Sequence, residues 1–153
     1  MINEAASGQT RQPVADLSKR DRIRVLYVED DPNCREAIAD ELSDYGFIVR
    51  SFGDGASLLD ALAVATEADI ILLDWGMPDV SGIDLLVQLR QSGVNLPVVF
   101  FTGYAFSAQE NLAFDRGAVD FIDKMVGVEI LARRLRLLLA TPKRQPLLSR
   151  PLP

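Results

Sequence analysis

Acidic side chains follow two apolar runs of the sequence at the point where each run ends. Glu29 and Asp30 come directly after RVLYV, and Asp74 comes directly after IILL. Crowding carboxylates at the end of buried strands is costly, because burial and like charges both raise their pKa values. A divalent cation relieves this cost, and Mg²⁺ prefers one or two carboxylates together with water and phosphate oxygens. We therefore expect a Mg²⁺ site if the two runs are neighbouring strands.

A hydroxyl group and an ammonium group end two further apolar runs. Thr102 follows VVFF, and Lys124 follows DFID. Taken singly, such a threonine is usually an ordinary strand or turn residue, and such a lysine is usually solvated. Beside a carboxylate nucleophile and a divalent cation, however, these two groups balance the charge of a phosphoryl group. The four run ends together indicate phosphoryl chemistry at Asp74.

A simpler explanation covers part of the EDDP segment. Asp31 precedes Pro32, which is the arrangement of an N-cap followed by a proline at the first helical position. A cap needs one carboxylate, so capping leaves Glu29 and Asp30 unexplained. Capping does not explain Asp74 either, because the segment WGMPDVSG separates it from the next predicted helix.

The elements that must position these side chains alternate along the chain. Apolar runs predict strands at residues 23–28, 47–52, 70–73, 97–101 and 121–122. Helical periodicity predicts helices at residues 33–45, 56–65, 83–91, 108–116 and 128–140. Candidate N-caps are Ser81 and Ser107, and candidate helix ends are Gly46 and Gly117. This order predicts an α/β fold, a doubly wound five-stranded parallel sheet with helices on both faces.

The predicted sheet brings the candidate residues to one edge. In an open parallel sheet, ligands bind in the crevice outside the carboxyl ends of the strands, where the strand order reverses. All of the polar run ends lie at carboxyl ends. The fold and the chemistry therefore indicate the same location.

Composition limits the partners and the compartment. A length of 153 residues with 48% hydrophobic residues is ordinary for one globular domain, and the net charge of −6 argues against direct binding to nucleic acid or an anionic membrane. The chain has no histidine, which excludes the usual zinc sites, and Cys34 is its only cysteine. Because the sequence has no membrane-length apolar run and no signal-peptide core, we expect a cytoplasmic protein.

Three parts are expected along the chain. Residues 1–21 are polar and lack periodicity, which predicts a mobile extension. Residues 22–140 form the predicted domain. Residues 141–153 contain four prolines, which is typical of a linker or a loose tail.

In this order and at these strand ends, the segments VEDDP, LLDWGMPDVSG, FFTG and DFIDK resemble the receiver domain of two-component response regulators. The resemblance spans about residues 22–140 and implies a flavodoxin-like sheet with strand order 2-1-3-4-5. It implies that Asp74 is the phosphoacceptor. Glu29 and Asp30 match the acidic metal pair, and Gly76 matches the residue whose backbone carbonyl also reaches Mg²⁺.

The resemblance assigns roles to five further residues. Thr102 matches the phosphoryl-sensing hydroxyl, Lys124 the phosphate-binding lysine, and Phe121 the aromatic switch position. Pro78 and Gly82 match the family's turn into the third helix.

Two positions depart from the family pattern. Met125 stands where the family usually has a proline joined to the lysine by a cis peptide bond. A cis bond before another residue costs roughly 2.5 to 4 kcal/mol, so we expect a trans bond here. Gly76 offers no side chain to cover the phosphoryl group, which leaves the lifetime of the phosphorylated form open.

The implied function is a phosphorylation switch and not turnover of an external substrate. Asp74 would accept a phosphoryl group from a sensor histidine kinase, after which Thr102 and Phe121 move and the face formed by the fourth helix, fifth strand and fifth helix changes shape. Charges on this face either pair across a two-fold dimer or are simply solvated; they are Asp115, Arg116, Asp120, Arg133 and Arg134. A transcriptional effector domain would lie outside this chain.

Three alternatives remain. A haloacid dehalogenase-type phosphatase also uses an aspartate nucleophile and Mg²⁺, but it needs a second aspartate at the position of Gly76. A flavodoxin-like cofactor binder needs a phosphate-cradling loop where this chain has EDDP. A degenerate receiver that acts as a binding module usually lacks the acceptor or the lysine, and this chain has both.

Overall fold

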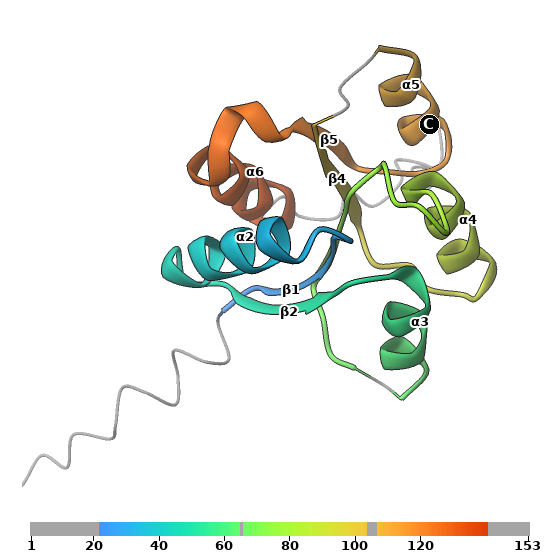
Figure 1. Ribbon diagram of the computed structural model, residues 1–153, viewed down its shortest axis with the longest axis horizontal. Coiled ribbons are helices and arrows are strands. Elements are labelled where there is room, and N and C mark those ends of the chain that lie inside the picture. The colour runs from blue at the N-terminus through green and yellow to red at the C-terminus, as the bar shows by residue number, and fades with distance from the viewer. Residues whose placement is uncertain (1–21, 65, 104–106, 141–153) are drawn as a thin grey trace, which may run out of the picture.

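The computed structural model of the chain describes residues 22–64, 66–103 and 107–140. The predicted extension 1–21, the predicted tail 141–153 and the last residue of the predicted helix 56–65 lie outside these ranges. Five strands form one parallel sheet in the order β2-β1-β3-β4-β5, which confirms the predicted topology (Figure 1). The strands are β1 (Arg24–Val28), β2 (Ile48–Phe52), β3 (Ile70–Leu73), β4 (Val98–Thr102) and β5 (Asp120–Asp123).

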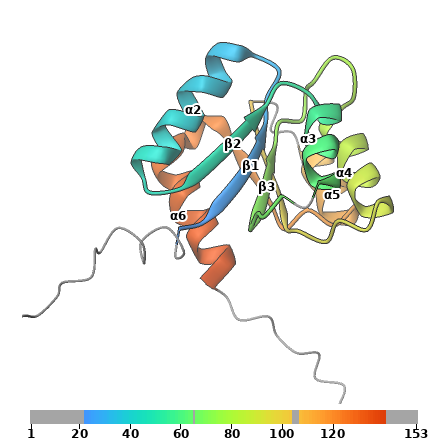
Figure 2. The same ribbon diagram turned by 90° about the horizontal axis from the view of Figure 1, so that it is seen from below.

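Helices cover both faces of the sheet, as Figure 2 shows. On one face lie α2 (Pro32–Asp44) and α6 (Gly127–Ala140), and on the other lie α3 (Gly55–Ala63), α4 (Gly82–Gln91) and α5 (Ser107–Asp115). A short 3₁₀ helix, η1 (Lys124–Val126), joins β5 to α6. The predicted doubly wound α/β fold is therefore confirmed.

The core has two halves because strand side chains alternate between the faces. In β3, Ile70 and Leu72 pack toward α2 and α6, whereas Ile71 and Leu73 pack toward α3, α4 and α5. All four are fully buried. Both faces of the strand are covered, which is why it reads as a continuous aliphatic run.

All five predicted helices are present, but each begins one residue earlier than predicted, and α2, α3 and α5 also end one or two residues earlier. Asp31 caps α2 by accepting from the backbone N–H groups of Asn33 and Cys34, and Ser81 caps α4. Gly46 and Gly117 follow α2 and α5 with φ values of +93° and +100°, a conformation that favours glycine. Ser107 is not a cap. It is the first residue of α5 itself, so the predicted helix start was one residue too late.

Neighbouring strands end at nearly the same level, which gathers their carboxyl ends. Val28 pairs with Leu73, and Leu73 pairs with Phe100. The backbone N–H of Asp74 donates to the carbonyl of Val28 at 3.1 Å, which fixes the start of the loop after β3 beside the end of β1. The residues that follow β1 and β3 must therefore lie side by side.

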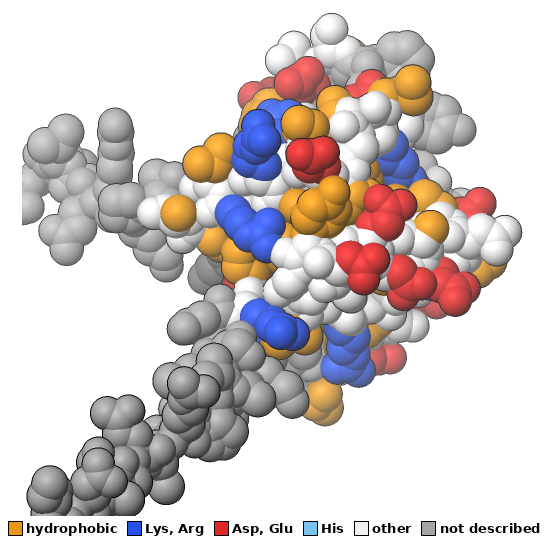
Figure 3. All heavy atoms as spheres, turned by 90° about the vertical axis from the view of Figure 1, so that its left-hand side faces the viewer, with side chains coloured by type: hydrophobic (Ala, Val, Ile, Leu, Met, Phe, Trp, Pro, Cys, Tyr) orange, Lys and Arg blue, Asp and Glu red, His pale blue; other side chains and the backbone are white. Residues whose placement is uncertain are grey.

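The side of the molecule that carries α2 and α6 is shown in Figure 3, where acidic side chains gather on one part and Lys and Arg side chains are spread over the rest. α2 supplies Glu36, Asp40, Glu41 and Asp44, and α6 supplies Arg133, Arg134 and Arg136. None of the described helices combines the length and the apolar character that a bilayer crossing requires.

Candidate functional site

Three carboxylates converge at the carboxyl edge of the sheet. Glu29 and Asp30 follow β1 and Asp74 follows β3, and one oxygen from each lies within 4.8 Å of the others. Glu29 and Asp74 are buried, with 2% and 5% of their surface exposed, whereas Asp30 lies nearer to solvent. The structure thus brings together the three acidic residues that the sequence singled out.

Glu29 is held by groups on several sides. Its Oε2 accepts from the hydroxyl of Tyr27 at 3.3 Å and from the ammonium of Lys124 at 2.7 Å, and its Oε1 accepts from the backbone N–H of Asp31 at 3.3 Å. Burial raises the pKa of the Glu29 carboxyl above its usual value, although the hydrogen bond from Lys124 opposes the rise. Tyr27 is fully buried, and burial likewise raises the pKa of its phenol.

Lys124 reaches the carboxylates from the first residue of η1. Its Nζ lies 2.7 Å from Oε2 of Glu29 and 3.7 Å from Oδ2 of Asp74. Burial lowers the pKa of the ammonium, but the bond to Glu29 and the charge of Asp74 outweigh it and hold the pKa above its usual value. Lys124 Nζ also lies 3.6 Å from Sγ of Cys34, so this cysteine borders the site.

The turn that carries Lys124 differs from the family pattern as expected. The described residues contain no cis peptide bond, which fits Met125 in place of proline. Instead, the Asp123 carboxylate accepts from the backbone N–H of Met125 at 2.8 Å and caps η1. A backbone donor that proline lacks therefore orders this turn.

The donor set fits a divalent cation. Oδ1 of Asp74 is buried and accepts no hydrogen bond from any residue that the structure describes. Buried polar atoms normally have a partner, and an exception points to an ion or water. A bare carboxylate oxygen flanked by two further carboxylates is suited to Mg²⁺, which binds hard oxygen ligands.

Thr102 lies on β4, which pairs with β3, and Phe121 lies on β5, the next strand of the sheet. Thr102 is the last residue of β4 and is fully buried. The Phe121 ring is 6% exposed and packs against Phe100 and Trp75, with ring centroids 6.0 and 5.9 Å away. Because Trp75 directly follows Asp74, an aromatic group links the loop after β3 to β5.

The loop after Asp74 is packed tightly against the turn that starts α4. The backbone N–H of Gly82 donates to the carbonyl of Trp75 at 2.9 Å. A Cβ at Gly82 would lie 2.3 Å from the carbonyl oxygen of Asp74, so only glycine fits. Gly76 and Pro78 are exposed in the same loop, two and four residues after Asp74.

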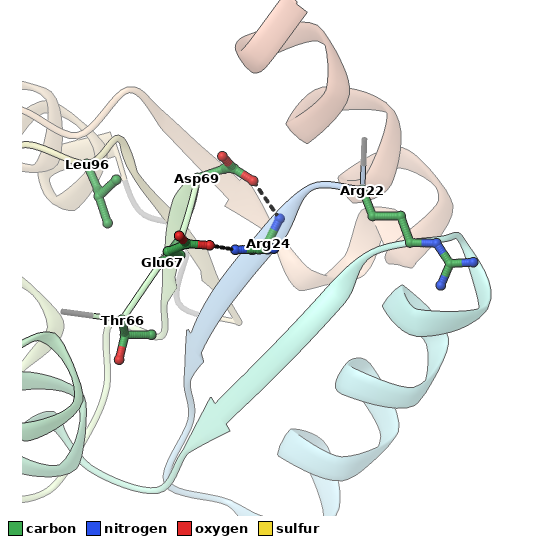
Figure 4. Close-up of a pocket in the computed structure, with 7 residues that line it drawn as sticks. Arg22, Arg24, Thr66, Glu67, Asp69 and Leu96 are labelled. Carbon is green, nitrogen blue, oxygen red and sulfur yellow. Dashed lines mark hydrogen bonds and ion pairs between the residues drawn. The ribbon is translucent and has the colours of Figure 1, made fainter. Parts of the chain in front are cut away.

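Two hollows lie at opposite edges of the sheet. A pocket of about 220 Å³ adjoins the carboxylates, lined by Asp30, residues 53–56 and residues 77–80. A wider hollow of about 650 Å³ lies at the amino ends of the strands (Figure 4). There Arg24 pairs with Glu67, and the Asp69 carboxylate accepts from the backbone N–H of Arg24, so both acidic groups of this hollow already have partners. The candidate site is therefore at the carboxyl edge.

Sequence reasoning missed residues that support the site, and Tyr27 and Trp75 are two of them. Tyr27 lies two positions before Glu29 on the strand, and residues two apart share one face, so its hydroxyl could have been assigned to the carboxylate. Trp75 carries no such signal, because its ring contacts come from β4 and β5 across the sheet.

Comparisons with known proteins agree with this geometry. The model of the response regulator receiver domain matches residues 25–136. The response regulator MprA of Mycobacterium bovis is 34% identical over 121 residues, which cover 79% of this chain and 52% of MprA. The chain thus spans about half the length of the curated relatives that it matches.

Solved structures show the same likeness. The BeF₃-activated N-terminal receiver domain of RstA from Klebsiella pneumoniae is 30% identical, with a TM-score of 0.71 over 77% of this chain and 99% of that one. The non-phosphorylated receiver domain of HemR from Leptospira biflexa is 25% identical, with a TM-score of 0.71 over 81% and 99%. The chain belongs to the family of response regulator receiver domains of two-component systems.

Proposed function

We propose that Asp74 accepts a phosphoryl group from a phosphohistidine on a sensor histidine kinase. A carboxylate oxygen of Asp74 attacks phosphorus, the P–N bond to the imidazole breaks, and an acyl phosphate forms as the imidazole takes up a proton. The same site would later release phosphate by hydrolysis. We propose no turnover of an external substrate.

The observation that carries this proposal is the convergence of three carboxylates, two of which lie against one ammonium group. Asp74 is buried at the end of a rigid strand, with Glu29 and Asp30 beside it and the Lys124 ammonium 3.7 Å from its Oδ2. A phosphoryl group on Asp74 would bring further negative charge next to Lys124, which can neutralise part of it.

Glu29, Asp30, Asp74 and the backbone carbonyl of Gly76 are the groups that we propose to hold Mg²⁺. When bound, the ion would neutralise charge on the transferring phosphoryl oxygens. The unpartnered Oδ1 of Asp74 supports this assignment. Gly76 contributes only backbone, and its exposed position leaves water free to approach the acyl phosphate.

Signal output would start at Thr102. We propose that its hydroxyl moves to bond a phosphoryl oxygen and that Phe121 shifts into the space that Thr102 leaves. The Phe121 ring starts from a buried position against Phe100, so the shift is a repacking of aromatic rings. The face formed by α5, β5 and α6 would carry the change.

Charged residues on this face are the proposed contacts of a two-fold dimer. Within the chain, however, Arg134 already bonds Asp120 at 2.9 Å. The charges that remain for pairing across a dimer are therefore Asp115, Arg116 and Arg133. The proposed location is the cytoplasm, and the proposed recipient of the signal is a transcriptional effector domain outside these residues.

Beryllofluoride, which mimics a phosphoryl group, provides a test. Trp75 is the only tryptophan and directly follows Asp74, so its fluorescence reports on the site. We expect a saturable change in emission that requires both Mg²⁺ and beryllofluoride, that is retained in Asp79→Asn, and that is lost in Asp74→Asn. A response without Mg²⁺, or an equal response in Asp74→Asn, would contradict the proposal.

A further inference from the structure

The side chain of Arg35 folds back over the loop that carries the acidic pair. Arg35 lies in the first turn of α2, and its Nη1 donates to the backbone carbonyl of Glu29 at 2.8 Å and to that of Asp30 at 3.4 Å. Within the described residues, Arg35 forms no ion pair with a carboxylate. Its guanidinium therefore fixes the backbone of the two acidic residues and leaves their carboxylates available.

Gly53 makes room for this guanidinium. A Cβ at Gly53 would lie 3.0 Å from Nη1 of Arg35, which is too close unless the arginine moves. The glycine does not have a positive φ, so a side chain here would be opposed by the guanidinium of Arg35 and not by the backbone conformation. The half-buried side chain of Arg35 thus lies between the acidic loop and the loop after β2.

The acidic loop is tied on two sides by this arrangement. The backbone N–H of Glu29 donates to the carbonyl of Phe52, the last residue of β2, at 3.1 Å. The carbonyl of Glu29 accepts from Arg35, which contacts the position after Phe52. The direction of the peptide between Glu29 and Asp30 is therefore fixed, and this peptide sets the positions from which both side chains extend.

The two possible roles of Arg35, positioning the loop and supplying charge, predict opposite changes in Mg²⁺ affinity when the arginine is replaced. As a fixed positive charge near the carboxylates, it repels a divalent cation, so loss of the charge alone would tighten Mg²⁺ binding. As a clamp on the loop, it keeps the ligands arranged in advance, so loss of the clamp would weaken binding because Mg²⁺ demands near-ideal octahedral geometry.

We propose that Arg35, whose guanidinium lies against Gly53, is a positioning residue that holds the Glu29–Asp30 peptide in the arrangement that binds Mg²⁺. This inference rests on the proposed metal site at Glu29, Asp30 and Asp74.

The test is a Mg²⁺ titration of the full chain followed by Trp75 emission. We expect Arg35→Gln to weaken Mg²⁺ binding about tenfold. Arg35→Lys keeps the charge but lacks the planar fork, so we expect it to weaken binding by a similar factor. Gly53→Ala keeps Arg35 but displaces it, and binding should weaken severalfold. Arg22→Gln removes an exposed charge at the amino ends of the strands, away from the site, and should bind as wild type does.

Urea unfolding in EDTA separates positioning from a general structural role. Equal or tighter Mg²⁺ binding by folded Arg35→Gln would overturn the proposal, and so would a loss of stability with unchanged affinity. If Arg35→Gln does not fold, Gly53→Ala and Arg35→Lys decide by the same criteria. If wild type binds no Mg²⁺, or if Asp30→Asn binds it equally well, the proposed metal site is overturned and this inference with it. If wild type binds Mg²⁺, Asp30→Asn does not, and the Arg35 and Gly53 variants bind it as wild type does, the metal site stands and this inference alone is overturned.

Discussion

The ammonium of Lys124 bonds the carboxylate of Glu29 at 2.7 Å across 95 residues of sequence. Glu29 is also one of the proposed ligands of Mg²⁺. Lys124 therefore holds a proposed metal ligand in the metal-free chain, and Mg²⁺ that binds Oε2 must displace or share this contact.

Replacing Lys124 with methionine should tighten Mg²⁺ binding while it destabilises the metal-free chain. The substitution frees Oε2 of Glu29 and removes a positive charge, so we expect the affinity for Mg²⁺ to rise about fivefold. Without metal, Glu29 loses its partner, and the free energy of unfolding should fall by about 2 kcal/mol, less than for a fully buried pair because the lysine is partly exposed. Trp75 emission and urea unfolding in EDTA measure the two effects. Unchanged or weaker Mg²⁺ binding would show that the contact does not compete with metal.

Replacing Gly82 with alanine should disturb the backbone that follows β3 at Asp74. The new Cβ would lie 2.3 Å from the carbonyl oxygen of Asp74, and backbone cannot move aside as a side chain can. We expect a loss of about 3 kcal/mol in unfolding free energy, at the upper end for overpacking. Gly103→Ala is the matched control, because a Cβ there has no neighbour within 4 Å among the described residues. A destabilisation no larger than that of the control would refute this reading of the turn.

Replacing Met125 with proline should destabilise the turn that carries Lys124, although proline is the family's usual residue there. Proline lacks the N–H that donates to Asp123, and it disfavours the helical conformation of the preceding Lys124. We expect a loss of about 1 kcal/mol. Met125→Ala keeps the donor and truncates a side chain that is 89% exposed, so it should have little effect. The account fails here if the proline variant is as stable as the alanine variant in urea.

Asp54 should contribute stability that depends on pH. It caps α3 by accepting from the backbone N–H of Ser57 at 2.7 Å, and this bond lowers the pKa of its carboxyl. A lowered folded-state pKa means that the contribution is present above the unfolded-state value and is lost as pH falls through the folded-state value. Asp54→Asn keeps a cap that does not titrate. Wild type should therefore lose stability relative to this variant below about pH 4. Equal responses of the two proteins to acid would contradict the prediction.

The sheet and the site carboxylates could be predicted because their signals are local. IILL and VVFF are continuous aliphatic runs, as strands covered on both faces require, and the acidic residues follow such runs directly. Ser107 was misplaced because serine is acceptable both as a cap and in the first turn of a helix, so its type does not fix the boundary.

The supporting contacts could not be predicted because they join distant segments. Arg35 bonds backbone carbonyls, which every residue has, so the sequence gives no sign of the partner. The ring contacts of Trp75 depend on the register of β3, β4 and β5. The trans turn at Met125 was expected from the missing proline, but its cap by Asp123 was not.

The central claim is that Asp74 is the phosphoacceptor, and intact mass tests it most directly. The protein is incubated with acetyl phosphate in the presence of Mg²⁺ or of EDTA, with Asp74→Asn and Asp79→Asn beside it. We predict that wild type and Asp79→Asn each gain one phosphoryl group that depends on Mg²⁺ and is lost in mild base, whereas Asp74→Asn gains none. No adduct on wild type, or an equal adduct on Asp74→Asn, would contradict the account.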